Sequence, residues 1–197
     1  NELIAQLNAS SDNILSDENR VSFGHSLAGQ INEEPYISNE LLQKENLYGF
    51  FCNIQKMYIT SVVEENVIKN KILQTGIMNA WAVSQYENEY NPVHWHEGAT
   101  ISSVMYLKIP EYKPRNIPNK NNKDGLIVFM NNPSVPAISL ETPLYALEPE
   151  VGDMFLFPAR LMHCVYPFQG PGERRSVSIN GFHYFEDEEK KIKKLIL

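Results

Sequence analysis

The sequence predicts a mainly β fold with flanking helices, and two observations carry that prediction. Apolar residues recur at helical spacing only in one stretch, about residues 40–71. From about residue 77 to residue 185 they form short β-like runs instead, separated by Asn, Asp, Gly and Pro. Many short strands with frequent turns are typical of a β-sandwich or barrel that packs a helix on its outside.

The bulk properties set the broad class of the protein. A chain of 197 residues fits one domain, which we expect to span residues 1–197. The net charge of −7 disfavours a nucleic-acid partner. The sequence has no run of about 18 apolar residues, so we expect no membrane span. With two cysteines, no disulfide framework and no visible signal peptide, we expect a cytoplasmic protein, in the host cytoplasm if the chain is viral.

The N-terminal residues 1–39 are polar, with Gly24, Gly29 and Pro35 as helix and strand breakers. We expect an irregular segment that wraps the outside of the domain. Ser38 then offers an N-cap for one long supporting helix over residues 40–71, with a possible break near Gly49.

The remaining elements are expected to be strands of the β core, residues 77–185. The insertion 111–124 is rich in Pro and Asn, which predicts a surface loop; this loop and the N-terminal segment are candidate lids. The predicted strands are Ile77–Tyr86, Thr100–Ile109, Gly125–Asn131, Leu140–Leu147, Asp153–Pro158, Cys164–Phe168 and Arg174–Phe185.

Five histidines are present, and three of them suggest a metal site. His94 and His96 are two residues apart, so on a strand both imidazoles project from the same face. Neutral imidazole is a common ligand for iron, zinc, copper and nickel. His163 opens a later strand, which antiparallel packing could bring to the pair. A pair of exposed strand histidines would look the same in sequence, and His25 and His183 are interpreted as structural.

The last predicted strand carries a cation without an obvious partner. Arg174, Ser176, Ser178 and Asn180 alternate onto one face of it. An arginine on an inward face must be paired, and no acidic residue is interleaved with it, so a ligand carboxylate is a natural counter-ion. The alternative is a surface salt bridge to an acidic residue, for which Glu173, Glu148 and Glu150 are the candidates.

The order of these features resembles the Fe(II)/2-oxoglutarate-dependent dioxygenases. The matching pieces are HWHEGATISSVMYL, GLIVFMNNP, VGDMFLFPARLMHCV and ERRSVSIN, all between residues 77 and 185. Within that superfamily the chain is most similar to the prolyl-hydroxylase-like group, and closest to oxygenases of phages and marine bacteria. The resemblance implies a double-stranded β-helix, also called a jelly roll, with supporting helices.

The resemblance also implies a metal site. It makes His94 the first iron ligand and His163 the distal one. The superfamily usually has a carboxylate at the position of His96, but the phage and marine group has a histidine there, so His96 is the expected third ligand. Glu97 is the alternative, at a spacing that fits less well.

The cosubstrate residues are implied in the same way. Arg174 matches the arginine that pairs with the C5 carboxylate of 2-oxoglutarate, with Ser176 as its hydroxyl helper. Tyr106 matches a tyrosine that reaches the same carboxylate, and Tyr86 is a looser match for the other end of the cosubstrate.

The expected function is therefore hydroxylation of a C–H bond with Fe(II), 2-oxoglutarate and O₂, releasing succinate and CO₂. The substrate would be a peptidyl, prolyl-type side chain or a small metabolite. Two alternatives stay open: a cupin-like three-histidine metalloprotein that does not use 2-oxoglutarate, and a non-catalytic phage β-sandwich module. A cupin would have no need of Arg174 and Ser176.

Overall fold

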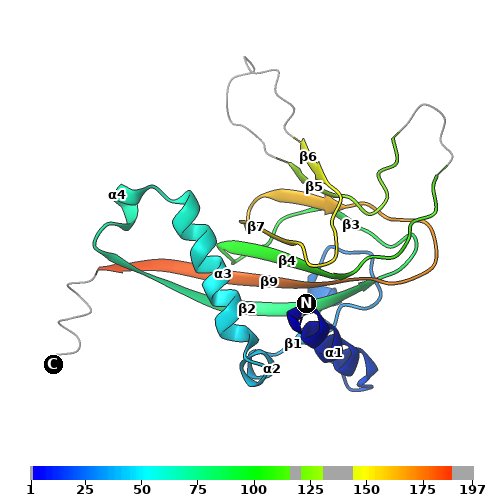
Figure 1. Ribbon diagram of the computed structural model, residues 1–197, viewed down its shortest axis with the longest axis horizontal. Coiled ribbons are helices and arrows are strands. Elements are labelled where there is room, and N and C mark those ends of the chain that lie inside the picture. The colour runs from blue at the N-terminus through cyan, green and yellow to red at the C-terminus, as the bar shows by residue number, and fades with distance from the viewer. Residues whose placement is uncertain (1, 116–120, 131–143, 188–197) are drawn as a thin grey trace, which may run out of the picture.

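The computed structural model describes residues 2–115, 121–130 and 144–187, and its core is two antiparallel β-sheets (Figure 1). The five-stranded sheet has the order β1-β2-β9-β4-β7, and the four-stranded sheet has the order β3-β8-β5-β6. The predicted mainly β fold with helices is confirmed. Parts of two predicted strands, Gly125–Asn131 and Leu140–Leu147, lie outside the described residues, as do residues 116–120 of the predicted loop.

The five-stranded sheet contains the two longest strands, β2 and β9. Its members are β1 (Tyr36–Ile37), β2 (Lys71–Gln85), β9 (Arg174–Asp187), β4 (Ile101–Lys108) and β7 (Met154–Pro158). The four-stranded sheet has short strands, which are β3 (Asn91–His94), β8 (Met162–Val165), β5 (Ile127–Met130) and β6 (Leu144–Leu147).

Each face of the five-stranded sheet packs against a different apolar layer. Facing the other sheet, Val104 and Tyr106 of β4 and Phe157 of β7 form a cluster with Ile127, Phe129 and Val165. On the outer face, Val177 and Ile179 of β9 pack against the helices. This alternation along β9 matches the alternation predicted from the sequence.

The predicted long helix is three helices in the structure: α2 (Asn39–Lys44), α3 (Leu47–Val62) and α4 (Glu65–Ile68). Ser38 caps α2 as predicted, since its hydroxyl accepts a hydrogen bond from the Leu41 N–H. The break falls at Asn46, whose φ of 59° is left-handed, rather than at Gly49. β2 also begins at Lys71, in residues that were expected to end the helix.

The N-terminal segment differs most from the prediction, because Glu2–Ser16 form a helix, α1. Its apolar stripe is short and lies among polar residues, so the sequence alone suggested an irregular segment. Leu7 is buried, and Leu3, Ile4 and Ile14 pack beside it on the outer face of the sheet. After α1, a 3₁₀ turn (Gly24–Ser26) and an extended loop lead into β1. No helix within the described ranges is long and apolar enough to cross a membrane.

Candidate metal and cosubstrate site

Strand pairing in the smaller sheet brings the three histidines together. His94, the last residue of β3, lies directly opposite His163 of the antiparallel strand β8. His96 lies two residues beyond the end of β3, where its N–H donates to the Ala159 carbonyl at 2.8 Å. That backbone hydrogen bond anchors the chain at His96, whose ring lies beside the strand pair.

The side-chain nitrogens of these residues form one compact group. One ring nitrogen from each of His94, His96 and His163 lies within 4.8 Å of the other two. The Nε2 atoms of His96 and His163 are 3.2 Å apart. The structure therefore brings together the three imidazoles that the sequence singled out. His25 and His183 are outside the group.

Backbone carbonyls fix the orientation of two of the rings. His94 Nδ1 is 2.7 Å from the Pro92 carbonyl, and His163 Nδ1 is 2.9 Å from the Leu161 carbonyl. Because a carbonyl only accepts, each Nδ1 carries the proton and each Nε2 keeps its lone pair. This is the arrangement by which metal-binding histidines are oriented.

Burial keeps the imidazoles neutral. Burial, together with the charge of the neighbouring rings, lowers the pKa of His96 to about 3 and the pKa of His163 to about 4. Burial also lowers the pKa of His94. A metal ion needs neutral imidazole, so all three rings are in the protonation state of a ligand at neutral pH.

Glu97 does not join this group. It is exposed, and it is absent from the set of ligand atoms that converge on the histidines. The geometry thus favours His96 over Glu97 as the third donor, because the chain beyond β3 directs the His96 ring inwards and leaves Glu97 outside.

Arg174 lies in the same cavity as the histidines, on the facing sheet. It is only 4% exposed. One terminal nitrogen donates to Gln85 Oε1 at 2.7 Å and the other to the Tyr106 hydroxyl at 3.0 Å. The guanidinium also lies 4.8 Å from the centre of the Tyr106 ring. Burial raises the pKa of Tyr106, although Arg174 acts in the opposite direction.

No carboxylate neutralises Arg174 within the described part of the chain. Its Nε is buried and has no hydrogen-bond partner there. Glu173, one of the acidic candidates for a surface salt bridge, binds Arg175 instead. A buried cation held by neutral groups leaves its charge available for an anionic ligand.

Two further predicted residues have different outcomes. Ser176 is opposite Tyr106 on β4 and Val83 on β2, and it lines the cavity. The placement predicted for Tyr86 is wrong: Tyr86 follows β2, is 47% exposed and does not line the cavity. Its neighbour Gln85 lines the cavity instead, where it holds Arg174, because alternation along β2 sends residue 85 inwards and the next residue out. Alternate residues of a strand share a face, so Trp81, Val83 and Gln85 lie on the same side of β2, and this period would have identified Gln85.

The sequence reasoning also missed Glu34. This residue lines the cavity, is 2% exposed, and belongs to the N-terminal loop that was given no chemistry. No local motif marks it, because its neighbours in space are far away in sequence.

Comparison with known proteins identifies the family. Residues 79–180, more than half of the chain, match the family model described as "Putative 2OG-Fe(II) oxygenase". The chain belongs to this family, and it is therefore an oxygenase of a kind whose cofactors are Fe(II), 2-oxoglutarate and O₂. A search of curated proteins found no match.

Solved structures share the fold. AviO1 from Streptomyces viridochromogenes matches with a TM-score of 0.58 at 11% identity, covering 92% of this chain and 84% of that one. A prolyl-4-hydroxylase from Pseudomonas putida matches with a TM-score of 0.55 at 12% identity, covering 94% and 86%. HygX from Streptomyces hygroscopicus, solved with nickel, 2-oxoglutarate and hygromycin B, matches with a TM-score of 0.53 at 10% identity, covering 91% and 77%. The fold is the double-stranded β-helix, as the resemblance implied.

Proposed function

We propose that the protein hydroxylates a C–H bond of a peptidyl side chain or small metabolite, using Fe(II), 2-oxoglutarate and O₂ and releasing succinate and CO₂. The observation that carries the proposal is the pairing of two features in one cavity. Three neutral imidazole nitrogens converge on one sheet, and the buried Arg174 without an acidic partner faces them from the other.

The residues fit both groups. His94, His96 and His163 offer three nitrogen donors that lie within 4.8 Å of one another, a donor set that suits Fe(II). With no carboxylate in the set, the ion would keep its double positive charge, which favours binding of a dianion. Bound iron would supply the oxidative chemistry with O₂, while the protein orients the reactants.

Arg174 would bind the distal carboxylate of 2-oxoglutarate. Gln85 and Tyr106 hold its two terminal nitrogens, so the guanidinium is fixed before the ligand arrives. Such pre-organisation lowers the entropy lost on binding. Tyr106 and Ser176, opposite each other across β4 and β9, add hydroxyl groups beside it. A cupin-like protein or a non-catalytic module would leave this buried charge without a counter-ion.

The test is an anaerobic titration of the purified protein with Fe(II) and 2-oxoglutarate, monitored by the weak visible charge-transfer band. We expect the band in the wild type. Arg174→Ala should weaken 2-oxoglutarate binding by about a hundredfold, because a buried charge-assisted pair contributes roughly 1.5–3 kcal/mol, while iron binding changes little. The exposed Arg160 provides a control: Arg160→Ala should behave as the wild type. No band and no retained iron would refute the proposal, and equal loss of iron and 2-oxoglutarate in Arg174→Ala would make Arg174 structural.

A further inference from the structure

The cavity contains one carboxyl group, that of Glu34, for which the proposed chemistry has no use. Glu34 lies on the extended loop before β1, and its side chain lines the same cavity as His94, His96 and Arg174. It is not in the group of ligand atoms around the histidines. Its role must therefore be sought outside the metal site.

The loop backbone fixes the position of Glu34. The Ser84 and Ala82 N–H groups donate to the carbonyls of Glu33 and Pro35, at 2.9 and 3.0 Å, so the residues on both sides are anchored to β2. The Glu33 side chain points away from the cavity and pairs with Arg20 at 2.9 Å. The alternation of an extended chain then sends the next side chain, Glu34, inwards.

Gly29 leaves room for this carboxyl group. A Cβ at Gly29 would lie 3.2 and 3.3 Å from the two Glu34 carboxyl oxygens and would overlap the Asn91 side-chain oxygen. The backbone of Gly29 does not have a left-handed φ. The absence of a side chain there thus serves to accommodate Glu34 and Asn91 beside the cavity.

Glu34 has no charge partner in the described residues. Its Oε2 is buried without a hydrogen bond, and no cation pairs with the carboxylate. The charge that acts on it is that of another carboxylate, Glu89. Burial, helped by Glu89, raises the pKa of Glu34 to about 7. An unpaired buried carboxylate is costly unless a ligand supplies the counter-ion.

We propose that Glu34 binds a protonated amine or guanidinium group of the substrate. This inference rests on the proposed function, since it names the substrate class of the same cavity. Arg174 would take the carboxylate of 2-oxoglutarate and Glu34 the cationic group of the substrate, so the two bound molecules are sorted by charge. A hydroxyl group could satisfy the hydrogen bond, but it would leave the negative charge of Glu34 unpaired.

The test uses n-butylamine, protonated at neutral pH, and its neutral counterpart 1-butanol. Binding of each is measured by anaerobic calorimetry, both to the protein loaded with Fe(II) and 2-oxoglutarate and to the metal-free protein. We expect the wild type to bind butylammonium and to bind butanol at least tenfold more weakly. Glu34→Gln should weaken butylammonium binding by at least tenfold and leave butanol unaffected. Glu33→Gln removes a neighbouring charge that faces outwards, so it should bind butylammonium as the wild type does.

The outcomes separate the two proposals. Equal binding of butylammonium by the wild type and Glu34→Gln, no binding of it by the wild type, or equal binding of amine and alcohol would each overturn this inference. Loss of iron in Glu34→Gln would also overturn it, because Glu34 would then support the metal. Absence of the charge-transfer band in the wild type counts against the proposed function instead, and amine binding to the metal-free protein would still test Glu34.

Discussion

At the scale of single residues, position 96 distinguishes this site from the usual two-histidine, one-carboxylate arrangement. His96 points into the group of imidazoles and Glu97 lies outside it. We expect His96→Ala to lose iron and Glu97→Ala to retain it, because only the first substitution removes a converging donor. Iron content after anaerobic loading and desalting is the measurement. Retention by His96→Ala together with loss by Glu97→Ala would place the carboxylate in the metal site.

Glu34 gives a second prediction at this scale, and it concerns stability. Burial raises the pKa of Glu34 in the folded protein to about 7, above the ordinary value of 4.5. Between these two pH values the folded protein therefore keeps a proton on Glu34 that the unfolded chain releases. The unpaired charge therefore has its full destabilising effect above pH 7. This effect decreases as the pH falls from 7 to 4.5, and it is absent below pH 4.5.

Glu34→Gln should accordingly be more stable than the wild type at pH 8, with the advantage disappearing near pH 4.5. Urea unfolding at the two pH values, with Glu33→Gln as the control, measures this difference. An advantage that is the same at both pH values would show that the charge of Glu34 is not its cause.

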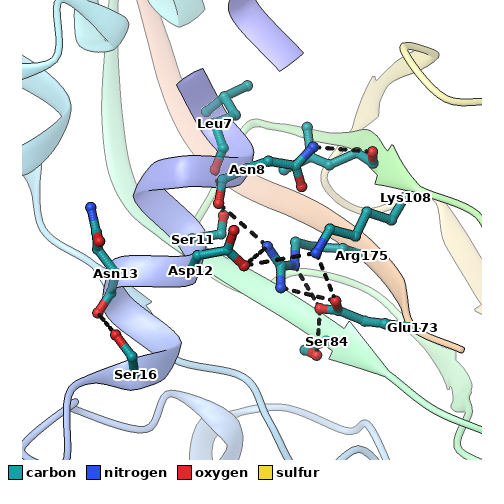
Figure 2. A network of polar contacts seen from close by, with 11 residues as sticks. Leu7, Asn8, Ser11, Asp12, Asn13, Ser16, Ser84, Lys108, Glu173 and Arg175 are labelled. Atoms are coloured by element: carbon teal, nitrogen blue, oxygen red, sulfur yellow. Dashed lines mark hydrogen bonds and ion pairs between the residues drawn. The ribbon is translucent and has the colours of Figure 1, made fainter. Parts of the chain in front are cut away.

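At the scale of elements, the buried Arg175 attaches α1 to the sheet (Figure 2). Alternation along β9 puts Arg175 on the face opposite Arg174. The Arg175 guanidinium donates to Glu173 at 2.6 Å and to Asp12 of α1 at 2.6 Å. Ser84 and Lys108 also contact Glu173. Neighbouring arginines on β9 thus differ: Arg175 binds carboxylates of the protein, whereas Arg174 has no carboxylate partner among the described residues.

Glu173→Gln should destabilise the protein by on the order of 3 kcal/mol, because it removes the main partner of a buried cation. Burial by itself would raise the pKa of Glu173, but hydrogen bonds from Arg175, Ser84 and Lys108 outweigh it and lower the pKa. The stabilisation is therefore present above pH 4.5 and is lost as the pH falls further.

Urea unfolding at pH 7 and pH 3 measures this effect. The pair of Arg20 and Glu33, whose side chains are 31% and 35% exposed, is the more accessible control, for which removal of the carboxylate should cost about 1 kcal/mol or less. A similar small cost for Glu173→Gln, or a cost that persists at pH 3, would contradict the assignment.

At the scale of the whole molecule, the proposed ligands join the two sheets. The histidines belong to the four-stranded sheet and its flanking turn, whereas Arg174 belongs to the five-stranded sheet. A ligand that binds only the folded state at a hundred times its Kd adds about 2.7 kcal/mol of stability. Fe(II) should therefore raise the Tm by several degrees, and 2-oxoglutarate should raise it further.

Anaerobic calorimetry measures both increments. In Arg174→Ala the iron increment should remain and the 2-oxoglutarate increment should largely disappear, because the variant keeps the imidazoles and loses the carboxylate partner. An undiminished 2-oxoglutarate increment in this variant would argue that the cosubstrate does not reach across to the five-stranded sheet.

Much of the fold could be predicted because its signals are local. The alternation along Arg174–Asn180 correctly assigned both faces of β9, and Ser38 marked the start of α2. Predictions failed where a local signal was weak. The sparse apolar stripe of α1 suggested an irregular segment. At the end of β2 the prediction selected Tyr86, whereas the residue that faces inwards is its neighbour Gln85. The lid roles of the N-terminal segment and loop 111–124 stay predictions, as does the closeness to phage and marine oxygenases.

The sequence by itself indicated the class of protein, through the resemblance of its motifs to a known family. It also singled out the candidate donors, because histidine spacing, strand period and an unmatched arginine are local features of the chain. Tertiary structure decided which of them meet. Antiparallel register placed His94 opposite His163, the chain beyond β3 brought His96 beside them, and β2 placed Gln85 against Arg174. It also brought Glu34 to the cavity from far along the chain, since burial and charge pairing depend on neighbours in space that no local pattern records.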